Sequence, residues 1–377
     1  MSVAWGKVPA MERGPDERKV RFSPELQLAL DCCAFGFRNG AAARPTPHHN
    51  IDWLRFLELV RFDRIEGIAW NALSAKDSLP HDVRSTLSQA ASAIAAENLL
   101  AIVQCRALLE QFQSARVPLL FLKGLTTGAL SYTNSAIKSA LDIDLLIDPA
   151  DLDRACELLR DCGYQLVAPQ SRNAKALPRW HRQWKESVWA KDAPPSTIDL
   201  HTRTADNRRL IPTITVHSPS QFVELGSVSL PTLAPDELFA YLAVHGASSA
   251  WFRIKWISDF AGFLHDKSAD EIERLYRRSQ ALGAGRASGQ ALLLADTLFG
   301  TLAGTPALSR ELSSDRATQW LFEAALRLIA GEPVEPTERR LGTVAIHTTQ
   351  FLMRPGIGFK ISELRAQSAR LMSRLLV

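Results

Sequence analysis

The pattern of apolar and polar positions predicts a central α/β segment between two helical regions. Apolar residues run together in VPLLFL (117–122) and alternate with acids in DIDLLID (142–148), and both patterns are typical of strands. On either side, apolar residues recur every three or four positions, which is typical of amphipathic helices. The predicted fold class is therefore α+β, a small mixed sheet with helices, flanked by N- and C-terminal helical regions.

The same pattern sets the expected elements and regions. Helices are predicted at 24–35, 52–60, 84–115, 149–162, 236–249, 252–265, 270–282, 289–301 and 315–329, and after the Pro355-Gly356 break. Strands are predicted at 117–122, 142–147 and 164–169, and as a hairpin that ESVWA and TIDLHT form around KDAPPS. Four regions follow: a mobile N-terminus (1–22), an N-terminal helical region (23–115), a core (116–232) and a C-terminal helical domain (233–377).

Composition and charge narrow the class of protein. The 377 residues include 44 lysines and arginines against 40 acids, a net charge of +4. This mild excess fits an anionic substrate but is too small to predict stable nucleic-acid binding. The five cysteines are odd in number and show no Cys-x-x-Cys pair, so we expect no disulfide framework and a cytoplasmic location. No long uncharged apolar run is present, so no membrane span is expected.

Three acids are the candidate metal ligands. Side chains in a strand alternate between faces, so Asp142 and Asp144 point one way and Ile143 points the other. In TIDLHT the same alternation places Asp199 and His201 on one face. Paired carboxylates are the ligands that Mg²⁺ prefers. His201 is expected either to share this site or to cap the sheet.

A glycine turn lies between the two predicted core strands. Gly124 ends the first apolar strand, and a helix that begins near Leu125 would direct free backbone N–H groups at an anion. Asp148 continues the alternation of acids, but it stands before Pro149, where a helix cap is expected. A phosphate-binding turn beside a carboxylate pair points to phosphoryl or nucleotidyl transfer.

The motifs LKG (122–124), DIDLLI (142–147) and the strand with Asp199-Leu-His resemble the uncharacterised nucleotidyltransferase family of the DNA polymerase beta superfamily. The resemblance covers roughly residues 50 to 265, and it implies a polymerase-beta-like nucleotidyltransferase core. It implies that Asp142 and Asp144 hold Mg²⁺ (or Mn²⁺) bound to a nucleoside triphosphate, with ATP the first candidate. Asp199 would complete a second metal site or take the proton of the acceptor hydroxyl.

The resemblance also implies a set of phosphate contacts. Backbone N–H groups after Gly124 would cradle the β- and γ-phosphates, and Lys123, Thr126 or Thr127 would add a side-chain contact. The wider superfamily has Gly-Ser or Gly-Gly at this turn, whereas this chain has Gly124 followed by leucine. Lys138 stands where close relatives are expected to have arginine, so the charge is kept but the planar fork is lost.

Two further groups of charged residues have two interpretations each. Segment 172–191 holds three tryptophans among basic residues that include Arg172, Lys175, Arg179, Arg182 and Lys185. It is predicted to be either a solvated loop or a wall that contacts triphosphate and stacks a base. Lys255 and Asp259 lie one helical turn apart, so they form either an ordinary ion pair or, as the resemblance implies, part of the cleft.

Two other patterns have a plain and a functional interpretation. The pair His48 and His49 has no further ligand at a usable spacing and is expected to lie in a loop. In the last helix, Ile361, Leu364, Leu371 and Leu375 share one side. They are expected either to dock on the bundle or to form a basic amphipathic surface for an acidic partner or a membrane.

Three classes of function follow. The first is a nucleotidyltransferase that modifies a hydroxyl of a small molecule, peptide or protein. The second is a phosphotransferase that uses the same site, as in tailoring of lasso-type peptide natural products. The third is a binding or regulatory module without catalysis, which the presence of all three acids disfavours. No residue decides between the first two, and the acceptor is not encoded in a recognisable motif.

Overall fold

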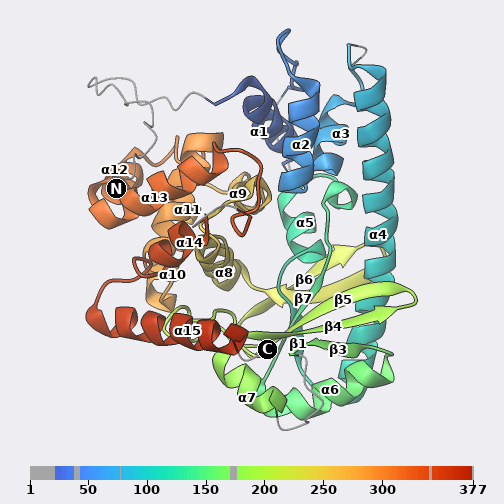
Figure 1. The fold of residues 1–377 in the computed structure, drawn as a ribbon, viewed down its shortest axis with the longest axis vertical. Coiled ribbons are helices and arrows are strands. Elements are labelled where there is room, and N and C mark those ends of the chain that lie inside the picture. The colour runs from blue at the N-terminus through green and yellow to red at the C-terminus, as the bar shows by residue number, and fades with distance from the viewer. Residues whose placement is uncertain (1–21, 38–42, 77, 170–175, 339–341, 376–377) are drawn as a thin grey trace.

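The computed structural model describes residues 22–37, 43–76, 78–169, 176–338 and 342–375 (Figure 1). Before the sheet come α1 (Pro24–Gly36), α2 (Trp53–Asp63), α3 (Glu66–Leu73) and α4 (His81–Ser114). The core contains β1 (Leu119–Phe121), α5 (Leu125–Ser131), β2 (Ile143–Ile147), α6 (Leu152–Asp161), β3 (Gln165–Ala168), α7 (Ala176–Gln183), β4 (Glu186–Asp192) and β5 (Pro195–His201). A separate hairpin, β6 (Ser220–Leu225) and β7 (Val228–Leu233), follows.

The C-terminal part is helical. Its elements are α8 (Pro235–Ser248), α9 (Ile254–Leu264), α10 (Ala269–Leu282), α11 (Arg286–Phe299), α12 (Pro306–Ser314), α13 (Arg316–Ile329), α14 (Gly342–Gln350) and α15 (Ile357–Leu375). The predicted α+β class is confirmed. The four predicted regions stay a prediction, and residues 1–21 lie outside the part that the structure describes.

The five-stranded sheet has the order β1-β2-β5-β4-β3. The pair β2–β5 is parallel, with Asp144 opposite Asp199 and Leu146 opposite His201. The other pairs are antiparallel, including the β4–β5 hairpin that the sequence predicts. The parallel pair lies at the centre of the sheet, where both faces are covered, as is usual for parallel strands.

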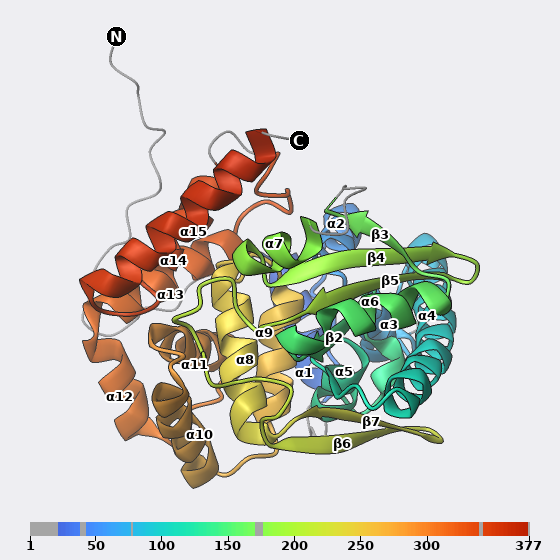
Figure 2. The ribbon, with the colours of Figure 1, turned by 90° about the horizontal axis from the view of Figure 1, so that it is seen from below.

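The two faces of the sheet bury different sets of side chains. Ile143, Leu145 and Ile198 pack with residues of α4 and α6, whereas Leu122 and Leu146 join the core of α1–α3 and α8–α13. The expected alternation along the strands is thus confirmed. Asp144, Asp199 and His201 alternate with the residues that pack on α4 and α6, so they share the face of Leu146, which is the face toward the helical bundle. Helices α8 and α9 lie beside the sheet in Figure 2.

Local sequence signals explain where several helices begin. Ser23 caps α1 by accepting from Leu26 N at 3.2 Å, and Asp52 and Asp148 accept from backbone N–H groups at their own helix starts. The predicted role of Asp148 as a cap is confirmed. Missed were α3, α7, α12, α14 and the β6–β7 hairpin, whose elements are all short.

Helix α4 is long and apolar enough, by length and composition alone, to cross a membrane. One such helix is weak evidence, because long core helices pass the same test. Its buried residues, among them Leu108 and Phe112, pack with the sheet. That no segment spans a membrane stays a prediction.

Gly262 allows α9 to lie close to α5. A Cβ at this position would lie 2.7 Å from the carbonyl oxygen of Ser131 and 3.0 Å from Phe37. The approach also lets Ser131 Oγ donate to the Asp259 carbonyl at 2.7 Å. Gly262 therefore sets the distance between the helix after the glycine turn and the helix that carries Lys255 and Asp259.

We expect Gly262→Ala to lower the free energy of unfolding by about 1–3 kcal/mol, because the added methyl group overpacks a backbone contact. In a helix, alanine is intrinsically more favourable than glycine by about 1 kcal/mol. A loss of stability in Gly262→Ala must therefore come from the backbone contact. Urea unfolding measures the change. Gly358→Ala in helix α15, where the nearest atom lies at an ordinary 3.6 Å, is the matched control and should cause no loss of stability. Equal stability of the two variants would contradict the role of Gly262.

Candidate active site

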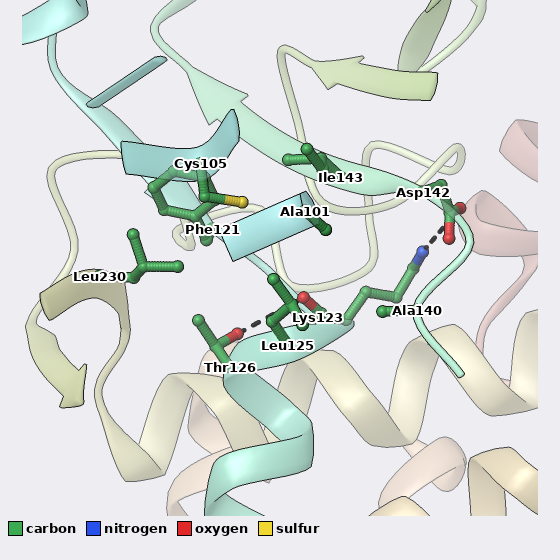
Figure 3. A pocket seen from close by; sticks show the side chains of 10 residues that line it. All are labelled: Ala101, Cys105, Phe121, Lys123, Leu125, Thr126, Ala140, Asp142, Ile143 and Leu230. Carbon is green, nitrogen blue, oxygen red and sulfur yellow. Dashed lines mark hydrogen bonds and ion pairs between the residues drawn. The ribbon is translucent and has the colours of Figure 1, made fainter. Parts of the chain in front are cut away.

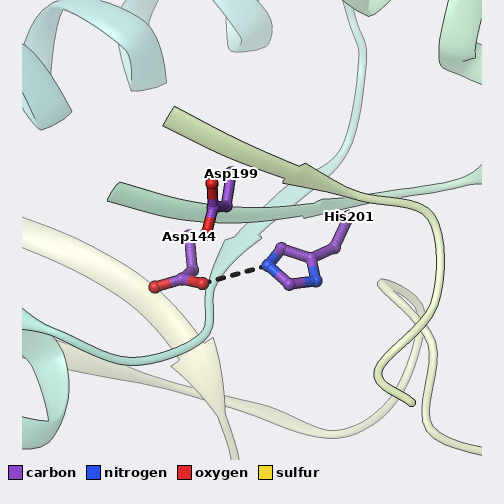
Figure 4. Close-up of side chains that lie close together, drawn as sticks. All are labelled: Asp144, Asp199 and His201. Carbon is purple, nitrogen blue, oxygen red and sulfur yellow. Dashed lines mark hydrogen bonds and ion pairs between the residues drawn. The ribbon is translucent and has the colours of Figure 1, made fainter. Parts of the chain in front are cut away.

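The centre of the site is the pair Asp144 and Asp199 on the neighbouring strands β2 and β5. Their Cα atoms are register partners, so both carboxylates point to the same face of the sheet. Single ligand atoms of Asp144, Asp199 and His201 all lie within 4.8 Å of one another (Figure 4). Asp144 is only 1% exposed. Two acids that are distant in sequence thus form one carboxylate cluster, in which Asp144 is buried and Asp199 is half-buried.

His201 holds the carboxylate of Asp144. Its Nε2 lies 3.0 Å from Asp144 Oδ1 and 3.2 Å from Glu186 Oε2. Both neighbours are carboxylates, so Nε2 carries the proton and donates it. Nδ1 is buried and has no hydrogen-bond partner within the part described. The ring of His201 thus contacts Asp144, the candidate metal ligand, directly. This contact favours the first of the two interpretations, in which His201 shares the site, over a cap on the sheet.

Glu186 is a fourth acid, and the sequence interpretation did not assign it to the site. It begins β4 and is the register partner of His201. Its carboxylate also forms an ion pair with Lys185. Burial favours the neutral acid, but the charge of Lys185 outweighs this effect and the pKa of Glu186 falls to about 2. The predicted hairpin of ESVWA and TIDLHT, if its register had been worked out, would have placed Glu186 opposite His201 and so in the site.

Lys123 connects the glycine turn to the acids. Its Nζ lies 3.4 Å from Asp142 Oδ2 (Figure 3). It also forms a second, closer ion pair with Asp144. Burial works against the charged amine, but the two carboxylates outweigh it and raise the pKa of Lys123 well above its usual value. Because β2 begins at Ile143, Asp142 lies in the preceding bend and not in the strand. Both acids nevertheless reach the same lysine.

The turn at Gly124 needs glycine. Its φ of +74° is in a region that other residues rarely adopt. Thr126 Oγ1 lies 3.5 Å from the carbonyl oxygen of Lys123, and Thr127 is fully buried with no partner for its hydroxyl within the described ranges. The structure places both threonines inside the fold. Their predicted contact with phosphate stays a prediction.

A small pocket borders Lys123 and Asp142 on the side of α4. Its lining is mostly apolar and includes Phe121, Ile143 and Leu230 (Figure 3). Its water-accessible volume is about 10 Å³, which is room for one water molecule. A nucleobase does not fit there in this conformation.

Helices α8 and α9 supply charged and polar groups from the other side. Lys138 Nζ lies 3.2 Å from Asp259 Oδ2, and Asp259 Oδ1 accepts from Tyr132 OH at 3.0 Å. Asp259 therefore pairs with Lys138 and not, as one interpretation had it, with Lys255. Burial alone would raise the pKa of Asp142, but nearby positive charges lower it below its usual value. Lys123 has the largest effect of these charges, and Lys255 has the next largest.

Lys255 is half-buried and has no carboxylate within ion-pair distance among the residues that the structure describes. Burial, followed by the charges of Lys138 and Arg64, lowers its pKa to about 7. Its only ring contact there is with Trp256, whose centroid lies 6.0 Å away. A lysine in this position is suited to pair with an anion from outside the chain.

Tyr241 on α8 was also missed. Its hydroxyl is buried without a hydrogen-bond partner in the described ranges. Burial, and then the charge of Asp144, raise its pKa well above the usual value. The hydroxyl is thus a neutral donor near the acids. The sequence places it in an amphipathic helix and carries no signal that it faces the site.

The basic aromatic segment divides into three parts. Residues 176–183 form α7 and not a loop, and Arg179 and Arg182 are exposed on it, whereas Lys185 lies in the site. Trp180 and Trp184 stack at 5.1 Å, and Trp189 is fully buried in the core. Arg172 and Lys175 lie outside the described residues. His48 and His49 are exposed before α2, in a loop as expected.

The donor set fits a hard divalent cation. Burial, together with the charges of Asp144, Glu186 and Asp142, raises the pKa of Asp199 to about 8. Such crowding of negative charge is what a bound cation relieves, and carboxylate oxygens are the ligands that Mg²⁺ and Mn²⁺ prefer. Nε2 of His201 is already engaged as a donor, so the oxygens of Asp144 and Asp199 are the better ligands.

The mixed sheet, with a carboxylate pair on adjacent strands and a glycine turn beside it, is consistent with a nucleotidyltransferase core. Residues 49–300 match the model of a family described as uncharacterised nucleotidyltransferases. This match covers more than half of the chain, and the protein belongs to that family. A search of curated proteins finds no match. The resemblance read from LKG and DIDLLI is therefore confirmed.

We expect Asp199→Asn to weaken Mn²⁺ binding by more than about 100-fold, because it removes a metal ligand. Substitution of a residue that only supports a ligand usually lowers metal affinity by about 10- to 100-fold. Glu186→Gln is the matched control, because it also removes one negative charge, but from a carboxylate that Lys185 and His201 hold. It should weaken Mn²⁺ binding by only about tenfold. Isothermal titration calorimetry measures both. The metal-free Asp199→Asn protein should be at least as stable as wild type, because folding at neutral pH no longer has to protonate the crowded Asp199 carboxylate. Equal Mn²⁺ affinities in the two variants would exclude Asp199 as a ligand.

Proposed function

We propose that this protein is a metal-dependent nucleotidyltransferase that passes a nucleoside monophosphate from a nucleoside triphosphate, with ATP the first candidate, to an acceptor hydroxyl. The observation that carries the proposal is the register of β2 with β5, which brings Asp144 and Asp199 together beside His201. Mg²⁺ or Mn²⁺ at these carboxylates, with Asp142 nearby, would neutralise charge that develops on the phosphate oxygens. All five cysteines are free, which supports a reducing cytoplasm as the location.

The bonds in the proposed reaction balance without a further reagent. The acceptor oxygen forms a bond to the α-phosphorus, the α–β phosphoanhydride bond breaks, and pyrophosphate leaves with the bonding electrons. The acceptor proton passes to a carboxylate or to water, and Asp199 is the acid that no lysine within the described residues pairs with. His201 keeps Asp144 oriented during this step through its Nε2–H.

Four lysines lie in or near the acid cluster, and one of them is left to bind the triphosphate. Lys123 and Lys185 already touch site carboxylates, and Lys138 is paired with Asp259. Lys255 lacks such a partner, so it is the residue we assign to the phosphates. Arg179 and Arg182 stand on the exposed side of α7, and they are better placed for the acceptor than for the buried acids.

Mass spectrometry of candidate acceptors tests the proposal. Each is incubated with the protein, Mg²⁺ and one nucleoside triphosphate, and we expect the mass of a nucleoside monophosphate to be added. Asp144→Asn should abolish the addition while the protein stays folded. Addition of phosphate alone would replace the proposal by phosphotransfer at the same site. If every acceptor stays unmodified and no nucleotide binds, the protein is a non-catalytic module.

We expect Lys255→Met to raise the KM for the nucleoside triphosphate more than it lowers kcat, because an interaction made equally in ground and transition states has that effect. The pKa of about 7 adds a pH dependence. Below it Lys255 is charged and binds phosphate, and above it the lysine loses its proton, so KM should rise between pH 6 and 8.5. Lys138, Lys123, Arg64 and Asp259 are the charged groups that face it.

Lys255→Arg is the matched control, since arginine keeps its charge throughout this range. It should bind the triphosphate with a KM that changes little with pH. A steady KM in wild type, or an unchanged KM in Lys255→Met, would remove Lys255 from the phosphate site.

A further inference from the structure

The last helix exposes an apolar stripe that no other part of the described chain covers. Ile357, Ile361 and Leu364 are spaced as one face of a helix, and their side chains are 78%, 45% and 57% exposed. The opposite face, with Phe359 and Glu363, is buried against the protein. The sequence placed Ile361 and Leu364 on one side of this helix, and the structure shows that this is not the docked side.

Cations flank this stripe. At 100° per residue, Lys360 and Arg365 lie on either side of it, and both are exposed. The only acid of α15 is Glu363, which is buried and accepts from Asn207 Nδ2 at 2.7 Å. The exposed charge on this part of α15 is therefore all positive.

The loop 203–209 joins α15 to α7. Asn207 bonds to Glu363 and, at 3.1 Å, to Ser362 Oγ of α15, while Arg208 donates to the Arg182 carbonyl of α7 at 3.0 Å. The side-by-side placement of α15 and α7 is visible in Figure 2. We call the exposed faces of α15, this loop and α7 the α15–α7 surface.

The α15–α7 surface leads to the candidate active site. Asp206 of the loop accepts from Lys185 N at 3.2 Å, and Lys185 pairs with Glu186. The exposed charged residues along this route are Arg179, Arg182, Arg208, Arg209, Lys360 and Arg365. The fully exposed charges between the apolar stripe and the site are therefore cations, and the partly exposed acid Asp206 lies among them.

We propose that the α15–α7 surface binds an acidic polypeptide with apolar side chains, and that this polypeptide carries the acceptor hydroxyl. The apolar stripe would anchor it as an amphipathic segment, and the cations would select acidic residues beside the anchor. A polypeptide is favoured over a bilayer because Asp144 and His201 are buried, so the acceptor group must extend into the protein from the surface. The acceptor role and the choice of a polypeptide over a bilayer rest on the proposed nucleotidyl transfer, whereas the exposed apolar stripe and its flanking cations do not.

Fluorescence anisotropy tests the docking without nucleotide. The probe is a labelled synthetic peptide of glutamate, leucine and serine, with leucines at helical i, i+4, i+7 spacing. We expect binding that weakens as salt rises, because exposed charges are screened over about 8 Å near physiological ionic strength. The triple variant Lys360→Glu, Arg365→Glu and Arg208→Glu should weaken binding by about tenfold, because three exposed ion pairs are lost and each is replaced by repulsion.

A second triple variant controls for net charge. Arg278→Glu, Arg310→Glu and Arg316→Glu reverse three exposed cations on α10, α12 and α13, and they should leave peptide binding unchanged. The double variant Ile361→Ser and Leu364→Ser tests the anchor with no change of charge, and it should also weaken binding. Circular dichroism confirms that each variant is folded.

Three results would overturn the docking. They are no binding of the peptide, equal binding by both triple variants, and binding to phosphatidylserine vesicles without binding to the peptide. A separate measurement tests the acceptor role: mass spectrometry of the bound peptide should show a nucleoside monophosphate added to its serine. Binding that depends on the surface with no such addition would overturn the acceptor role alone. If no acceptor of any kind is modified while docking persists, the proposed transfer fails and the docking surface stands.

Discussion

The site depends on the parallel pairing of β2 with β5 in one register. Side chains alternate along a strand, so a slip by one residue would turn Asp199 toward the opposite face from Asp144. The apolar residues on that opposite face, Ile143, Leu145 and Ile198, prevent such a slip, because it would move them out of the core formed with α4 and α6. The hydrophobic contacts on one face therefore position the acids on the other.

This placement brings negative charge together at a depth where water screens it poorly, and buried charges cost stability unless they are paired. The positive charge of Lys123 pairs with the carboxylates of Asp142 and Asp144, and the charge of Lys185 pairs with that of Glu186. The hydrogen bond from His201 orients Asp144 among these charges. Strong perturbation of several titratable groups in one place is more typical of functional sites than of structural ion pairs.

The site and the α15–α7 surface share the segment from α7 to β4. His181 is buried in α7, and its ring nitrogens lie 3.0 Å from Thr202 Oγ1 and 3.1 Å from Ser187 Oγ, which anchors the helix to the hairpin. Burial lowers the pKa of His181 to about 4, so it serves as a neutral anchor. The same short segment thus presents cations to solvent and directs Lys185 and Glu186 to the acids.

The sequence by itself determined the elements whose signals are local. Alternation along DIDLLI and TIDLHT predicted which face carries Asp144 and Asp199, and the caps Ser23, Asp52 and Asp148 marked helix starts, because strand pleat and cap hydrogen bonds involve only near neighbours. Only the tertiary structure decided which distant groups meet. The β4–β5 register brought Glu186 to His201. The packing of α9 placed Asp259 beside Lys138 and left Lys255 with no ion-pair partner among the residues that the structure describes. It also decided that the exposed side of α15 is the one with Ile361, because helical periodicity defines faces but not the neighbour that covers them.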